Sequence, residues 1–98
     1  MSGSSGFVAV LVIDLHFPDA GSLKSKRKEL SSIKAQLHGR MGAAVAEVDH
    51  QDLWQRATLG VAIVSGESRQ VDERIQSVRD LVNATYGAEL IDWEEQRA

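Results

Sequence analysis

The sequence has no cysteine, a single proline and only five aromatic side chains among its 98 residues. Without cysteine there are no disulfides, no thiolate catalysis and no zinc or iron–sulfur site built on thiolates, which is compatible with a reducing cytoplasm. No apolar run approaches the roughly 20 residues that cross a bilayer, and no leader-like segment opens the chain. We therefore expect neither a membrane protein nor a secreted one.

The composition that remains is that of one small globular domain. Hydrophobic residues make up 43% of the chain and charged residues 26%, which is too apolar for a disordered protein. Residues 1–6, Met-Ser-Gly-Ser-Ser-Gly, have the composition of an expression linker and are set aside. Residues 7–98 leave room for one core, so we predict a single domain.

Four segments have the pattern of β-strands. Residues 7–15 are apolar on both alternating faces and rich in β-branched side chains, which indicates a central strand. Residues 43–50 and 57–65 are two further candidates, and the segment between them is too short for a crossover helix, so they should form a hairpin. Residues 89–94 alternate with acids, which is typical of an edge strand.

Two segments have the period of amphipathic helices. The first should begin after Ser22 and stop at Gly39 and Gly42, with an apolar arc of Leu23, Leu30, Ile33 and Leu37. The second should be capped by Ser68 and end at Gly87, with an apolar stripe of Val71, Ile75, Val78, Leu81 and Val82.

The predicted order is therefore βαββαβ, an α+β fold. Two split βαβ units with right-handed crossovers stack both helices on one face of a four-stranded antiparallel sheet, the ferredoxin-like sandwich. The first and third strands are then central, and they are the two most apolar strands. The other sheet face lacks helix cover, so we expect a second copy of the chain to cover it.

Positive charge is concentrated in one segment. Residues 22–40 hold six of the eleven Lys and Arg residues and one of the fourteen acids, so their net charge is +5 against −8 for the rest. A solvated helix face would normally mix both signs, so the bias favours a polyanionic partner. No RNP1-like strand, GXXG loop or P-loop accompanies it. The candidate nucleic-acid-binding residues are Lys24, Arg27, Lys28 and Lys34, assisted by Arg40 and Arg56.

Lys26 differs because it falls inside the apolar arc of the same helix. A buried ammonium needs a partner, so we predict a structural ion pair with Glu47 or Asp49 on the second strand.

Leu53 and Trp54 lie in the hairpin loop and have the composition of an interface hot spot. The sequence leaves open whether Trp54 meets a partner or folds back to close one end of the core. Trp93 and Tyr86 are interpreted as packing residues.

Polar residues at two strand ends could be combined into a metal or acid/base site. Asp49, His50 and Asp52 follow the second strand, and Asp14 and His16 end the first. We expect the carboxyl ends of these two strands to lie at opposite ends of the sheet, so the groups should not converge. No catalytic residue, metal site or cofactor is therefore assigned.

Three segments resemble a known family. Leu15-His-Phe-Pro18, Ser22-Leu-Lys-Ser-Lys-Arg27 and the run from Ala46 to Ala57 are similar to the signature segments of the bacterial YlxP-like family, domain of unknown function 503. The resemblance covers residues 7–95 and implies a ferredoxin-like fold. Genes of this family often lie beside translation-initiation and ribosome-maturation genes, which implies a cytoplasmic role near the ribosome. It supplies no catalytic residues.

Three functions are thus in competition. The leading hypothesis is a non-enzymatic protein that binds RNA or a ribosomal particle through its first helix. The alternative is a homodimeric interaction module that uses the open sheet face, with Leu53 and Trp54 engaging a partner. The third is a small metal-assisted or acid/base enzyme that uses His16, Asp49, His50 or Asp52.

Overall fold

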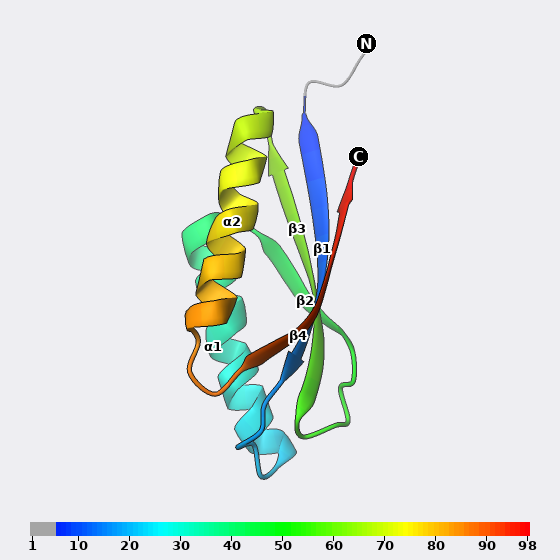
Figure 1. The fold of residues 1–98 in the computed structure, drawn as a ribbon, viewed down its shortest axis with the longest axis vertical. Coiled ribbons are helices and arrows are strands. Elements are labelled where there is room, and N and C mark those ends of the chain that lie inside the picture. Colours follow the sequence, from blue (N-terminus) through cyan, green and yellow to red (C-terminus); the bar gives the residue numbers. More distant parts are fainter. Residues whose placement is uncertain (1–5) are drawn as a thin grey trace.

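The computed structural model describes residues 6–98, so the expected linker at residues 1–6 lies outside the described residues except for Gly6. The elements in chain order are β1 (Phe7–His16), α1 (Leu23–Met41), β2 (Ala44–Asp49), β3 (Arg56–Ser65), α2 (Ser68–Ala84) and β4 (Glu89–Arg97) (Figure 1). The predicted βαββαβ order is confirmed.

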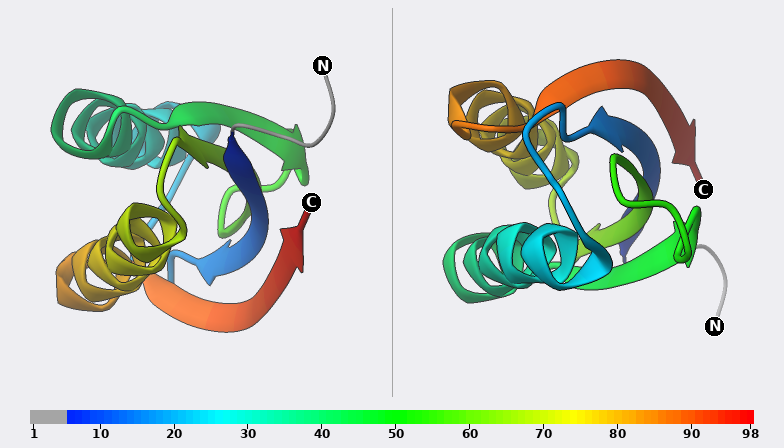
Figure 2. Two further views of the ribbon diagram at one scale, coloured as in Figure 1. Left: turned by 90° about the horizontal axis from the view of Figure 1, so that it is seen from above. Right: turned by 90° about the horizontal axis from the view of Figure 1, so that it is seen from below.

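The four strands form one antiparallel sheet in the order β2-β3-β1-β4. The two apolar strands, β1 and β3, are central as predicted. Seen along the long axis of the molecule, both helices lie on the same side of the sheet and leave its other face bare (Figure 2). We call this side the bare face.

The core lies between the sheet and the helices. Because side chains alternate along a strand, one set from each central strand points to the helices and is buried. Strand β1 contributes Ala9, Leu11, Ile13 and Leu15, and β3 contributes Ala57, Leu59, Val61 and Ile63. The helices cover them with Leu30, Ile33 and Leu37 from α1 and with Val71, Ile75, Val78 and Val82 from α2.

The ends of the helices follow the predicted signals only in part. Ser22 caps α1, since its Oγ accepts a hydrogen bond from the amide of Ser25 at 3.1 Å. The helix ends at Gly42, whose φ of 62° is left-handed, whereas the expected stop at Gly39 is wrong because Gly39 lies inside α1. Leu37 and Met41 pack on the core around it, which carries the helix past the glycine.

Both predicted ends of α2 need correction. Ser68 is the first helical residue and not the cap; Glu67 holds the cap position without a side-chain hydrogen bond. At the other end the cap is Thr85, and Gly87, with a φ of 88°, lies in the turn beyond it.

The bare face is apolar at one end and polar at the other. Its apolar end carries exposed Val10 and Val64 beside a shallow hollow of ≈ 260 Å³. The residues around that hollow are mostly small: Val10, Ala44, Val45, Ala46, Gly60, Val61 and Ala62. In residues 6–98 neither helix combines the length and hydropathy of a membrane span.

Candidate nucleic-acid interface

The exposed surface of α1 carries four cations, Lys24, Arg27, Lys28 and Lys34, which we call the basic ridge. Lys24, Arg27 and Lys28 are exposed and Lys34 is half-buried. Across the described residues, no ion pair involves any member of the ridge. The acids of the molecule therefore leave this charge available to a partner, a point that sequence alone could not decide.

Two further cations were grouped with the ridge by sequence. Arg40 is exposed in the last turn of α1, about 24 Å along the helix axis from Lys24. Arg56 lies elsewhere: it begins β3 on the bare face, where its guanidinium is 3.7 Å from the carboxylate of Asp14. Arg56 therefore lies apart from the ridge, because the alternation of β3 turns it away from α1, and its assisting role stays a prediction.

Lys26 is fully buried, with 0% exposure, and fastens α1 to the β2–β3 loop. Its Nζ lies 3.0 Å from the Glu47 carboxylate and donates to the backbone carbonyls of His50, Gln51 and Arg56 at 2.8, 3.2 and 3.1 Å. Asp49, the other predicted partner, instead accepts from the amide of His50. The buried charge is thus both paired and hydrogen-bonded, as a low-dielectric site requires.

The loop after β2 is also held from the side of β1. The amide of Phe17 donates to the carbonyl of Gln55 at 2.8 Å. The Gln55 side-chain amide donates to the carbonyls of Pro18 and Ala20 at 3.1 and 3.4 Å. Residues 50–56 are therefore tied both to α1 and to the segment that precedes it.

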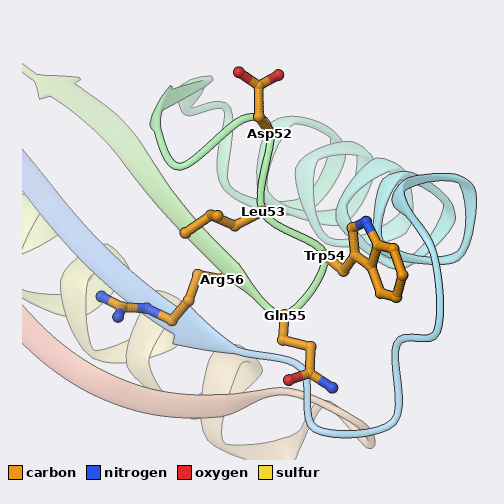
Figure 3. Close-up of a pocket in the computed structure, with 5 residues that line it drawn as sticks. All are labelled: Asp52, Leu53, Trp54, Gln55 and Arg56. Atoms are coloured by element: carbon orange, nitrogen blue, oxygen red, sulfur yellow. The ribbon is translucent and has the colours of Figure 1, made fainter.

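This loop presents Leu53 and Trp54 to solvent. Trp54 is 54% exposed, so it does not fold back to close the core, and its contact with a partner stays a prediction. In Figure 3 the two side chains point away from each other, Leu53 over β3 and Trp54 toward the start of α1. An open hollow of ≈ 570 Å³ lies beside them, lined by Asp52, Leu53, Trp54, Gln55 and Arg56.

Tyr86 lies in the turn between α2 and β4 and is 92% exposed, so its interpretation as a packing residue is wrong. The turn lies against α1: a Cβ built on Gly87 would be 3.4 Å from the Glu29 carboxylate. Trp93, by contrast, packs against the core, and the Arg79 guanidinium lies 4.3 Å from its ring centroid.

The polar end of the bare face brings together residues that were predicted to lie at opposite ends of the sheet. Because β3 is antiparallel to both β1 and β2, those two strands run in the same direction and their carboxyl ends meet. His50 Nδ1 lies 2.8 Å from Thr58 Oγ1, and the Thr58 hydroxyl donates a short hydrogen bond to Asp14. The expectation that these segments do not converge is therefore wrong.

The two hydrogen bonds that link His50, Thr58 and Asp14 fix the orientation and the tautomer of the His50 ring. Since the only proton of the Thr58 hydroxyl goes to Asp14, the Nδ1 of His50 must donate to Thr58, which leaves Nε2 free to accept or to carry a second proton. His16 lies apart, 3.3 Å from Glu89, and Asp52 lines the hollow of the loop. Within residues 6–98 no group of three or more His, Asp or Glu side chains is placed to hold a metal ion.

The strand order and the two helices on one face define a ferredoxin-like sandwich, here with an unpaired cationic surface on its first helix. Residues 8–95 match the family described as "Protein of unknown function (DUF503)", and the chain belongs to this family. The resemblance seen in the sequence is thereby confirmed.

One relative agrees with the family assignment, and two solved structures agree with the fold. The chain is 35% identical over 66 residues to the uncharacterized protein YlxP of Bacillus subtilis strain 168, covering 67% of this chain and 72% of that protein. The designed protein Foldit4 is similar in fold, with a TM-score of 0.54 at 12% identity over 94% of this chain and 96% of that one. The structural-genomics protein YJCS gives 0.51 at 8% identity over 93% and 98%. These two likenesses show the fold alone.

Proposed function

We propose that this protein is a non-enzymatic bacterial protein of the cytoplasm that binds structured RNA or a ribosomal particle through the basic ridge, with Arg40 extending the contact. The observation that carries the proposal is that these cations are solvent-accessible and have no acidic partner among residues 6–98, on a chain whose net charge is −3. Phosphates that meet such a surface release condensed counterions, which drives binding without base recognition.

The energetics of α1 by itself support an anionic partner. Lys24 lies three residues before Arg27 and four before Lys28, so like charges repel along the helix. The first turn holds no acid, although acids there would stabilise the helix dipole. Without a partner, α1 therefore has unfavourable electrostatic interactions, which the phosphates of an RNA backbone would relieve. The gene neighbourhood implied by the family resemblance points the same way.

A pull-down from bacterial lysate tests the proposal. The native chain should recover ribosomal RNA, and nuclease treatment should remove it. The variant Lys24→Glu/Lys28→Glu should recover less than a tenth as much. A matched control, Arg69→Glu/Arg74→Glu on α2, changes the net charge equally but leaves the ridge intact, and it should behave as the native chain. Equal loss in both variants, or none in the ridge variant, would contradict the proposal.

A second candidate is a homodimer through the bare face, favoured by the exposed valines beside a hollow lined mostly by small residues. Val10 of one copy could pack into that hollow of the other around a two-fold axis. In this reading Leu53 and Trp54 engage a further partner. Val10→Glu should shift sedimentation equilibrium from dimer to monomer, whereas Tyr86→Glu, on a turn beside α1, should not. A native chain that is monomeric at high micromolar concentration contradicts this candidate.

A further inference from the structure

Two exposed aromatic side chains lie beside the same stretch of α1. Trp54 belongs to the loop that Lys26 holds, and Tyr86 belongs to the turn whose Gly87 lies against Glu29. Lys26 and Glu29 are three residues apart, about 4.5 Å along the helix axis. The members of the basic ridge in this half of α1 are Lys24, Arg27 and Lys28.

Both aromatics are held by ordered backbone. The loop carrying Trp54 is tied down by the three hydrogen bonds that Lys26 donates to its carbonyls and by the Gln55 side chain. The amide of Thr85, which precedes Tyr86, donates to the carbonyl of Val82, and the Thr85 hydroxyl donates to that of Leu81. Little backbone entropy is therefore lost when a flat group stacks on either ring.

The surface beside Lys28 also offers room and hydroxyl groups. A hollow of ≈ 450 Å³ opens on α1 and is lined by Ser25, Lys28, Glu29 and Ser32. A cationic track interleaved with exposed aromatic rings is the arrangement with which proteins bind single strands, because every base has a face that stacks and every nucleotide a phosphate.

Resting on the proposed function, we infer that the RNA segment bound here is unpaired. Its bases stack on Trp54 and Tyr86 while its phosphates lie on Lys24, Arg27 and Lys28. A duplex would meet the same cations, but its bases are already stacked and paired and offer no free face. An acidic peptide would satisfy the cations without needing the two rings.

Fluorescence anisotropy of dye-labelled probes separates these partners. The probes are a 12-nucleotide oligouridine, an RNA duplex of the same length and an oligoglutamate. The native chain should bind oligouridine more tightly than the duplex. Trp54→Ala and Tyr86→Ala should each weaken oligouridine binding about tenfold, the lower part of the range for one stacked base. Their affinity for the duplex should stay unchanged.

Two control variants sharpen the experiment. Trp54→Phe keeps an aromatic face and should retain most of the affinity for oligouridine. Val64→Ala removes an apolar group that is 61% exposed at the far end of the bare face and should have no effect. Circular dichroism of each variant verifies the fold.

The outcomes distinguish this inference from the proposal on which it rests. Duplex binding as tight as oligouridine binding, or native affinity for oligouridine in both alanine variants, overturns the inference. If the inference is overturned but the ridge variant Lys24→Glu/Lys28→Glu still loses RNA binding, the proposed function holds without the inference. Oligoglutamate binding that is equally tight and equally lost in Trp54→Ala also overturns the inference. A native chain that binds neither RNA overturns both.

Discussion

Lys26 is the residue on which the shape of the β2–β3 loop most depends. We predict that Lys26→Met lowers the free energy of unfolding by about 3 kcal/mol, because it leaves the Glu47 carboxylate partly buried without its counter-charge. Urea denaturation monitored by circular dichroism measures this. The control Lys24→Met, at an exposed position on the same helix, should change stability by less than about 0.5 kcal/mol. A Lys26→Met protein as stable as the native chain would contradict the account of the loop.

Thr58 carries the second prediction at this scale. Thr58→Val removes the hydroxyl that bridges His50 and Asp14, so the Nδ1 of His50 loses its acceptor. In the native chain at high pH the neutral ring should hold its proton on Nδ1, and the variant should shift it toward Nε2. Imidazole nitrogen chemical shifts report the tautomer directly. Identical tautomer populations in the two proteins would show that the chain of hydrogen bonds does not orient His50.

Single residues were predictable where burial conflicted with charge. A lysine inside an apolar arc requires a partner, and Glu47 stands on the strand facing it. Thr58 was missed, although a hydroxyl near the start of an otherwise apolar run was the available signal. The exposure of Tyr86 could not be predicted from the sequence, because the side chain of a turn residue can point toward the core or toward solvent. The separation of Arg56 from the basic ridge could not be predicted, because a residue at a strand end can point to either face of the sheet.

At the scale of elements, α1 has a side-chain cap at Ser22 but no acid in its first turn, where a negative charge would interact favourably with the helix dipole. Lys24→Glu places an acid in the first turn and should stabilise the fold by about 0.3–1 kcal/mol through the helix dipole. The same change should weaken RNA binding. Unfolding free energy and RNA affinity, measured on this one variant, should therefore move in opposite directions. A variant that is less stable, or that binds RNA unchanged, would contradict the interpretation of the basic ridge.

The periodicity of the sequence predicted each helix and strand, but it predicted the ends of the helices less well. The apolar arc of α1 and the stripe of α2 identified both helices. Gly39 did not end α1, since the burial of Leu37 and the packing of Met41 outweigh a cost of about 1 kcal/mol for an exposed helical glycine. Ser68 became the first helical residue of α2, with Glu67 extended before it.

For the whole molecule, the order of elements and the apolar character of β1 and β3 were enough to predict the sheet. Which strand ends lie together was predicted wrongly, because it depends on the direction of each strand in the sheet. Both β1 and β2 are antiparallel to β3, so they run in the same direction, and this brings His50 close to Asp14. The sequence also placed cations opposite the core of α1, but whether acids from other elements neutralise them required coordinates. The separation of the ridge cations from the acids of the other elements is therefore set by the fold and not by the sequence of α1 alone.

The salt dependence of RNA affinity tests the central claim most directly. If the four ridge cations and Arg40 each meet a phosphate of an unpaired strand, the logarithm of the binding constant should fall with the logarithm of salt concentration at a slope of about −3.5. Replacing Lys24, Arg27, Lys28 and Lys34 by glutamine should reduce the slope to about −0.7, because Arg40 alone remains. Equal slopes for the two proteins, or an affinity that salt does not change, would contradict the account.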